Sequence, residues 1–349
     1  MKKEARHATL YRTYRPQTFA EARHGQEAVV DTLEKSIKNK KTAHAYLFAG
    51  GRGTGKTSVA RILARTLGVS EKDLYEIDAA SNRGIDDIRQ LREGVYAAPF
   101  DSPYKFYIID EAHMLTKEAW NAFLKTLEEP PAHAIFVLAT TELEKVPDTI
   151  QSRCEIYAFK QPTREILVKV VTDIAKSEGY SLERSAAELV ALLAEGSFRD
   201  ALSILQKVLA VSDNKKIEVA EVEAVSGAPR GEMVRQILSA IAKKDVSSAL
   251  AVIAAALEES MDARTLAKLL IHRMRIVLLL RSAPDVGTQL AREQTEADRV
   301  LTRELSKEAG VNSNTLRMLL DAYAQMAYAA VPHLPLELAI IDICAPDQK

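Results

Sequence analysis

Residues 50–57 constrain the fold of this chain more than any other segment, because they read Gly-Gly-Arg-Gly-Thr-Gly-Lys-Thr. An apolar run over residues 45–49, typical of a buried strand, comes directly before them, and an amphipathic helix is predicted over 56–67. Glycines let backbone N–H groups turn toward phosphate oxygens, and the following helix adds its positive dipole end. A chance glycine-rich turn is the alternative, which the flanking strand and helix disfavour. The segment therefore predicts a phosphate-binding loop.

The side chains of this loop predict ATP or ADP with Mg²⁺ as the bound cofactors. Lys56 can reach the β- and γ-phosphates, and Thr57 can ligate magnesium. The residues expected to contact nucleotide in this segment are Gly50, Gly51, Arg52, Gly53, Thr54, Gly55, Lys56, Thr57 and Ser58. We interpret the chain as an enzyme that binds and hydrolyses ATP.

A second predicted strand supports this interpretation, because the apolar run over 106–109 ends in Asp110 and Glu111. Asp110 can hold Mg²⁺ through water, and Glu111 can orient and polarise the water that attacks the γ-phosphate. Two acids after a strand are usually a solvated strand end, but beside a phosphate loop they indicate catalysis. His113 is expected to be structural, since the acidic pair already supplies a base.

Five short apolar runs alternate with helical patterns up to about residue 160, which is typical of a doubly wound α/β fold with a parallel sheet. The runs are residues 45–49, 74–77, 106–109, 134–139 and 155–159. A helix over 117–128 is expected to stop at the two prolines that follow it, Pro130 and Pro131. We predict a first domain over residues 1–161.

After residue 161 the strand signal disappears, and only helices are predicted. Thr163, Ser185 and Ser197 are plausible helix caps, so residues 162–226 are predicted to form a small lid of three helices. A turn-rich break at 226–229 precedes an all-helical domain over residues 227–349. The helices expected there cover 234–243, 246–258, 263–280, 313–328 and 335–344.

Composition excludes several classes of protein. The 47 Lys and Arg residues nearly cancel the 48 Asp and Glu residues, so nucleic-acid binding would need a local basic surface. The only cysteines, Cys154 and Cys344, cannot make a disulfide framework or a four-cysteine zinc site within one chain. The basic N-terminus lacks the apolar stretch of a signal peptide, and no run is long enough to span a membrane. We expect a cytoplasmic protein.

Eight strings along the chain resemble the ATPase (gamma/tau) subunits of bacterial DNA polymerase III clamp loaders, which are AAA+ proteins. Besides the phosphate loop they are residues 11–19, 76–84, 110–115, 125–131, 138–141, 152–154 and 196–203. Residues 334–339 also look like the closing helix of the family's collar domain. The resemblance implies an AAA+ domain, a helical lid and a collar that holds the oligomer.

The resemblance implies a function in DNA replication. ATP binding would tighten a ring that opens a sliding clamp, and DNA-stimulated hydrolysis would release the closed clamp on primed DNA. The implied partners are the other clamp-loader subunits of a hetero-oligomeric, pentameric ring, the sliding clamp and primer-template DNA. The alternatives are a branch-migration type of AAA+ DNA motor, which residues 128–131 and 152–154 disfavour, and a non-hydrolysing structural subunit of the ring. Intact Lys56 and Glu111 disfavour the latter.

The resemblance also implies residue roles that spacing does not reveal. Thr141 corresponds to the first sensor, Arg199 to the second, and Arg153 to an arginine finger that acts on ATP bound by the neighbouring subunit. A guanidinium is always charged and forks two donors onto phosphate oxygens, which fits both arginine roles better than a surface ion pair. Residues 12–19 and 24–26 are expected to flank the adenine, with Tyr11, Arg12, Pro16 and Gln26 as the expected contacts.

DNA contacts are implied for Arg83, near a predicted helix start, and for Lys125, on the helix before the prolines. Both would bind the phosphate backbone, which makes binding salt-sensitive and indifferent to sequence. The alternative, that both are ordinary solvated surface charges, fits these two residues equally well.

The sequence departs from the family pattern in three places. Most members carry a four-cysteine zinc module before the second strand, but here only residues 68–73, without cysteine, intervene, so we predict no zinc. Ala22 and Arg23 replace the acidic or aliphatic residues usual before the His-Gly-Gln string, which leaves the adenine contacts open. The chain also stops near the end of the collar, which is expected of a short form or of a truncated chain.

Overall fold

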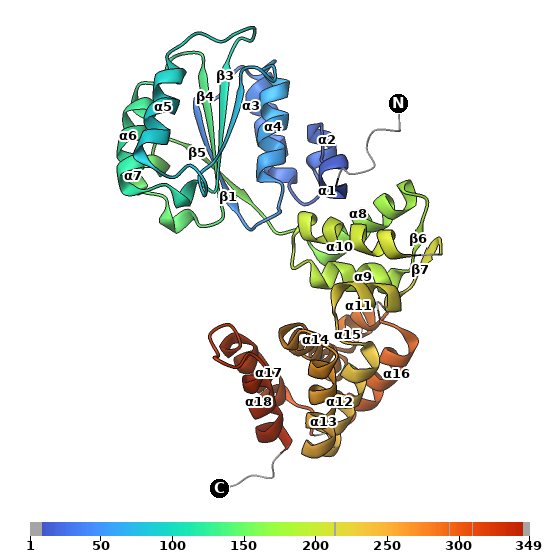
Figure 1. Ribbon diagram of the computed structural model, residues 1–349. Helices are drawn as coiled ribbons and strands as arrows, with labels where there is room; N and C mark the ends of the chain where they lie inside the picture. Colours follow the sequence, from blue (N-terminus) through green and yellow to red (C-terminus); the bar gives the residue numbers. More distant parts are fainter. Residues whose placement is uncertain (1–8, 213, 293, 309, 345–349) are drawn as a thin grey trace. The chain divides into compact units, whose positions relative to one another are not determined.

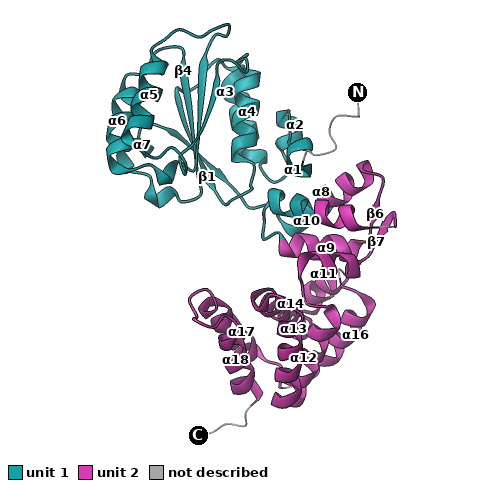
Figure 2. Ribbon diagram, in the orientation of Figure 1, with its two compact units in different colours: residues 1–170, 194–203 teal, residues 171–193, 204–349 magenta. Residues whose placement is uncertain are grey.

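The computed structural model describes residues 9–212, 214–292, 294–308 and 310–344 (Figure 1). They form two compact units (Figure 2). The first lies within residues 1–170 and 194–203, and the second within 171–193 and 204–349. The boundaries predicted at residues 161 and 226 stay a prediction.

A five-stranded sheet forms the centre of the first unit. Its strands are β1 (Ala45–Gly50), β2 (Leu74–Asp78), β3 (Lys105–Asp110), β4 (Ala134–Thr140) and β5 (Glu155–Phe159). All neighbours pair in parallel, in the order β2-β3-β4-β1-β5. The predicted parallel sheet is therefore confirmed. β1, β3 and β4 read as continuous apolar runs because the sheet is covered on both faces.

Helices cover both faces of this sheet (Figure 1). Phe48, Ile108 and Val137 face α3 (Glu27–Lys38) and α4 (Lys56–Thr66). Leu47 and Phe136 face the opposite way, toward α5 (Ile85–Val95), α6 (Lys117–Glu128) and the short α7 (Asp148–Gln151). The alternation of neighbouring strand residues between two cores follows from the period of two in a strand. Short helices complete this unit: α1 (Leu10–Thr13), α2 (Phe19–Ala22), η1 (Ala112–Met114) and η2 (Leu143–Lys145).

Helix α6 has the predicted bounds, and both ends have a clear cause. At its start the Thr116 hydroxyl accepts a hydrogen bond from the Ala119 backbone N–H at 3.2 Å. At its end, Pro130 disfavours a helical conformation in the residue before it. Phe123 packs edge-on against Phe136 of β4, with ring centroids 5.2 Å apart. Ala119, Trp120 and Leu127 of α6 are buried in the same core, so the helix packs on the sheet along its length.

Four helices follow the sheet: α8 (Arg164–Ser177), α9 (Arg184–Leu193), α10 (Phe198–Val211) and α11 (Val219–Ser226). Thr163 and Ser197 act as predicted caps, accepting from the backbone N–H groups of Ile166 and Asp200. The prediction of Ser185 as a cap was wrong, because α9 begins at Arg184 and Ser185 lies inside it. The prediction of three helices without strands was wrong, because α11 is an additional helix and β6 (Ser181–Leu182) pairs in parallel with β7 (Lys216–Ile217). A strand of two residues is too short to show an alternation of apolar and polar residues. Helix α11 is apolar on most sides, so its sequence lacks the helical period of apolar residues.

The rest of the second unit is helical. The described helices are α12 (Gly231–Lys243), α13 (Val246–Glu258), α14 (Ala263–Ser282), α15 (Pro284–Ala291), α16 (Glu296–Leu305), α17 (Ser313–Gln325) and α18 (Leu334–Cys344). The five predicted helices are confirmed, and α15 and α16 are additional. Ile253, Leu270 and Ile340 are fully buried in their common core. Buried Asp298 of α16 pairs with Arg235 of α12 and Arg273 of α14, which joins the three helices. Among the described helices none is long and apolar enough to cross a membrane.

Candidate active site

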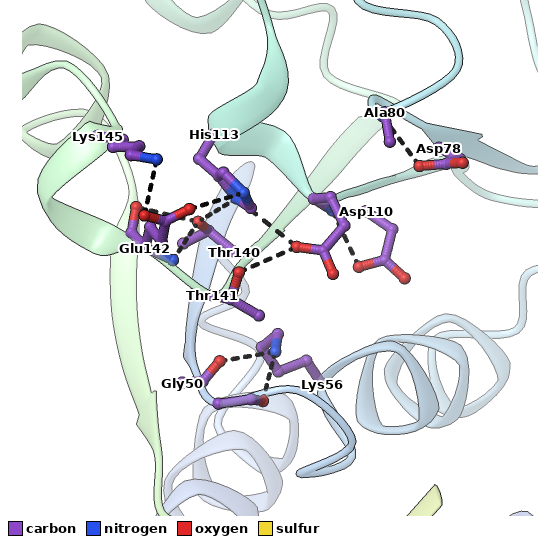
Figure 3. Close-up of polar contacts among 12 residues, drawn as sticks. Gly50, Lys56, Asp78, Ala80, Asp110, His113, Thr140, Thr141, Glu142 and Lys145 are labelled. Carbon is purple, nitrogen blue, oxygen red and sulfur yellow. Dashed lines mark hydrogen bonds and ion pairs between the residues drawn. The ribbon is translucent and has the colours of Figure 1, made fainter. Parts of the chain in front are cut away.

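The strand order brings the sequence-predicted residues of three segments together. β4 lies between β1 and β3, and all three are parallel, so their carboxyl ends meet at one edge of the sheet. The phosphate loop follows β1, Thr141 follows β4, and Asp110 ends β3. Ligands of open parallel sheets bind at this edge. Figure 3 shows Lys56, Asp110, His113 and Thr141 around one space.

The loop of residues 50–55 approaches its neighbours too closely for most side chains at two positions. A Cβ atom at Gly50 would lie 2.3 Å from the carbonyl oxygen of Phe159. Gly53 has a φ of +69°, and a Cβ there would lie 2.1 Å from the Ser197 hydroxyl oxygen. Glycine is therefore needed at both positions to keep the loop curled over the start of α4. Of the other predicted contacts in the loop, Arg52 is exposed and Ser58 is half-buried.

Lys56 lies inside this loop. Its Nζ donates hydrogen bonds to the carbonyl oxygens of Gly50 and Gly51, both at 2.8 Å. Burial lowers the pKa of Lys56 below its usual value, and the negative charges of Glu111 and Asp110 oppose that shift. The ammonium group is thus partly desolvated at the point where a phosphate bound by the loop would need a cation.

Thr57 and Asp110 form the second part of the site. The Thr57 hydroxyl donates a hydrogen bond to Oδ2 of Asp110 at 2.8 Å, which joins the first turn of α4 to the end of β3. A hydroxyl and a carboxylate are oxygen ligands of the kind that Mg²⁺ prefers. These two residues therefore fit a magnesium ion that is bound beside the phosphates.

Glu111 and Thr141 form the third part. The Thr141 hydroxyl donates a hydrogen bond to Oε2 of Glu111 at 3.2 Å. Glu111 has a left-handed backbone conformation, with φ +49° and ψ +43°, which turns the chain sharply after β3. The predicted first sensor and the predicted base are therefore brought into direct contact.

His113 contacts this group from η1. Its Nδ1 lies 3.1 Å from the Thr140 hydroxyl oxygen and 3.6 Å from Oε2 of Glu111. Its Nε2 lies 3.3 Å from Glu142, which is also paired with Lys145 at 2.8 Å (Figure 3). That Lys145 hydrogen bond holds the pKa of Glu142 below its usual value. Sequence reasoning missed Glu142, because nothing distinguishes it from other surface acids.

Arg199 lies near the loop, as predicted for the second sensor. The Phe198 N–H donates to the carbonyl oxygen of Gly53 at 3.0 Å, and a Cβ at Gly53 would lie 3.4 Å from that of Arg199. The guanidinium carbons of Arg199 and Arg12 each lie 5.8 Å from the ring centroid of Tyr11. Tyr11, one of the expected adenine residues, thus lies beside Arg199, and both belong to the first unit.

The other expected adenine residues have different surroundings. Gln26 is 3% exposed, and its amide donates to the carbonyl oxygens of Thr54 and Lys160 at 3.3 and 2.6 Å. These contacts brace the phosphate loop against the end of β5. Pro16 is half-buried. Its neighbour Arg15 belongs to the same predicted stretch, and burial and nearby guanidinium groups, Arg61 foremost, lower its pKa.

The remaining predicted residues lie on the surface of the first unit. Arg83 and Lys125 are exposed, and the carbonyl oxygen of Arg83 accepts from the Thr116 N–H at 3.1 Å, so Arg83 adjoins the start of α6. Arg153, which follows α7, contacts Glu128 and the carbonyl oxygen of Thr149. In the described residues none of the contacts of Arg153 involves the phosphate loop.

Comparisons with known proteins identify the family. Three family models match consecutive segments: "DNA polymerase III, delta subunit" over residues 25–79 and 69–163, "DNA polymerase III clamp loader subunit, ATPase lid domain" over 167–214, and "DNA polymerase III subunits gamma and tau domain III" over 217–349. The DNA polymerase III subunit tau of Bacillus subtilis is 37% identical over 358 residues, which cover 96% of this chain. The chain belongs to the DNA polymerase III gamma/tau family.

Other relatives agree with this assignment. The gamma/tau subunit of Mycobacterium tuberculosis is 34% identical over 97% of the chain, and the tau subunit of Escherichia coli is 35% identical over 95%. The chain spans 63%, 62% and 54% of the lengths of these three relatives, respectively. Thermotoga maritima RuvB is similar in structure, with a TM-score of 0.53 and 23% identity over 65% of this chain and 79% of its own. That likeness shows the AAA+ fold alone.

Proposed function

We propose that this chain is the ATP-hydrolysing subunit of a bacterial clamp loader, which opens a sliding clamp and loads it onto primed DNA. The observation that carries the proposal is the convergence of Lys56, the Thr57–Asp110 pair and the Glu111–Thr141 pair at one edge of the sheet. This arrangement supports nucleotide hydrolysis, and membership of the gamma/tau family supports the use of that hydrolysis in clamp loading.

Each part of the site has a proposed step in the reaction. Lys56 neutralises charge on the β- and γ-phosphates, and Thr57 and Asp110 hold Mg²⁺, which when bound screens the charge of the same oxygens. Glu111 orients the attacking water, and Thr141 fixes the rotamer of Glu111 through its 3.2 Å hydrogen bond. Arg199 supplies one positive charge beside the loop, with its Cβ 3.4 Å from a Cβ built at Gly53.

The proposed source of the further positive charge is Arg153 of a neighbouring subunit. Its position after α7, with contacts away from its own loop, supports a role in trans. Assembly with other clamp-loader subunits would then complete the site. We further propose that residues 227–349 hold a pentameric ring, that Arg83 and Lys125 contact primer-template DNA, and that Tyr11, Arg12, Pro16 and Gln26 lie near the adenine. The absence of zinc stays a prediction.

A non-hydrolysing structural subunit is the second candidate. Intact Lys56, Thr57, Asp110 and Glu111 argue against it, since Thr57 is hydrogen-bonded to Asp110 and both acids act electrostatically on Lys56. A branch-migration motor is the third, and the relatives over most of the chain are gamma/tau subunits rather than such motors.

The proposal is tested by measuring ATP turnover while the other loader subunits, the sliding clamp and primed DNA are added one at a time. We expect slow turnover by the isolated chain and strong stimulation only when the full complex meets both clamp and DNA, since an arginine supplied in trans is worth about 10³- to 10⁵-fold. Turnover that responds to a four-way DNA junction but not to clamp would favour the branch-migration motor instead.

Replacing Glu111 with glutamine should lower stimulated turnover by about 10²- to 10³-fold, because the amide cannot polarise the attacking water. ATP binding should be retained, since Glu111 makes no proposed contact with the phosphates. Rapid-quench turnover and fluorescent-nucleotide binding, measured on the same preparations, separate the two effects. Glu118→Gln, on the exposed first turn of α6, is the matched control. Full turnover in Glu111→Gln would show that another group orients the water.

A further inference from the structure

The guanidinium of Arg153 is held by its own chain at two points. Its Nη2 donates to Oε1 of Glu128 at 2.6 Å, and its Nη1 donates to the carbonyl oxygen of Thr149 at 2.7 Å. The hydroxyl of Ser152 is a longer contact, 3.3 Å from Nη1. A guanidinium has five N–H donors, so these contacts leave the Nε–H and one N–H of Nη2 for a phosphate. The Arg153 side chain is therefore held in one orientation while two of its N–H donors stay available.

Glu128 is well placed to act as a fixed support. It is the last residue of α6, directly after buried Leu127, and the two following prolines end the helix there. Thr149 belongs to α7, whose Ile150 is fully buried in the same core. The two groups that hold Arg153 thus come from elements that are packed against one sheet.

The ion pair contributes little to folding. The side chains of Arg153 and Glu128 are 34% and 46% exposed, and exposed pairs of this kind are screened by water and salt. The contact instead holds the long Arg153 side chain in one of the many rotamers that it could adopt. An arginine that reaches across a subunit boundary gains most from such pre-organisation, because ordering it at the moment of reaction costs entropy.

We propose that Glu128 is a positioning residue for Arg153: it holds the guanidinium in the orientation in which it meets the γ-phosphate of ATP in the neighbouring subunit. The inference rests on the proposed function of Arg153 in trans. It differs from an autoinhibitory contact, in which Glu128 would withhold the guanidinium and its removal would speed the reaction.

The test uses the full loader complex with clamp and primed DNA, and compares Glu128→Gln with Glu129→Gln. Glu129 is the matched control, because it is the adjacent exposed acid and in the described chain no contact joins it to Arg153. We expect Glu128→Gln to lower kcat on the order of tenfold, because the Arg153 side chain would no longer be ordered before the reaction. The KM for ATP should be unchanged. Glu129→Gln should stay within about twofold of the parent.

Four further measurements make the result decisive. ATP binding and thermal unfolding of the isolated Glu128→Gln chain should equal those of the parent, which excludes misfolding. In an Arg153→Ala background, Glu128→Gln should have no additional effect, as a double-mutant cycle requires of residues that act together. Glu128→Asp should recover part of kcat. If kcat of Glu128→Gln is unchanged or raised while Arg153→Ala is inactive, the positioning role is wrong but the finger stands. If Arg153→Ala is itself fully active, the proposed trans function fails.

Discussion

Replacing Arg153 with alanine is expected to lower DNA-stimulated ATP turnover by the assembled complex about 10³- to 10⁵-fold. The reason is electrostatic: the γ-phosphate carries growing charge in the transition state, and a guanidinium from the neighbour would stabilise it in a site that excludes water. ATP binding by the isolated chain should stay nearly unchanged, because the Arg153 side chain contacts Glu128, Thr149 and Ser152, which lie outside the phosphate loop.

The measurement is steady-state turnover of the complex, paired with nucleotide binding by the isolated subunit. Arg303→Ala, on the exposed last turn of α16, is a matched loss of one arginine away from α7. Loss of binding together with normal stimulated turnover is the pattern that would contradict the role in trans.

Replacing Lys56 is expected to weaken ATP binding by about 100-fold or more, since hydrogen bonds to charged groups contribute about 1.5 to 3 kcal/mol each and Lys56 would make at least two. Lys56→Met is the more informative variant, because it keeps the buried aliphatic stem and removes only the ammonium group. Lys56→Ala should lose binding to the same extent if charge, rather than packing, is responsible.

Binding is measured by titration of a fluorescent ATP analogue in the presence of Mg²⁺. Lys117→Ala, which removes an exposed lysine from the first turn of α6, serves as the control and should bind normally. Parent-like affinity in both Lys56 variants would rule out the assignment of residues 50–57 as the phosphate site.

Much of the fold of the first unit could be predicted because its sheet is buried on both faces. A doubly covered parallel strand must be apolar throughout, so Leu47, Ile108 and Val137 lie in runs that stand out from the helices between them. The helix after the phosphate loop was equally clear, because a glycine string comes directly before its start. Helix α6 was clear because two prolines follow its end. The positions of Lys56, Thr57 and Asp110 follow from these strands alone.

Other features depend on contacts that have no local signature. Residues 25 positions apart make the Arg153–Glu128 hydrogen bond, and both are surface residues of common types. The contact of His113 with Glu142 joins two short 3₁₀ segments that follow different strands. β6 and β7 are stabilised by their pairing with each other, which two-residue sequences cannot indicate. These two side-chain contacts and the strand pairing therefore depend on the tertiary structure, which no single segment of the sequence reveals.

The left-handed backbone of Glu111 has a consequence for the evolution of the site. A residue with a Cβ atom in this conformation costs about 1 to 2 kcal/mol relative to an ordinary helical or extended one, and glycine avoids most of that cost. Selection for thermal stability alone would therefore favour glycine after Asp110. If Glu111 orients the attacking water as proposed, a glutamate there lowers stability in exchange for activity, and a substitution that raises stability at this position would be expected to silence the enzyme.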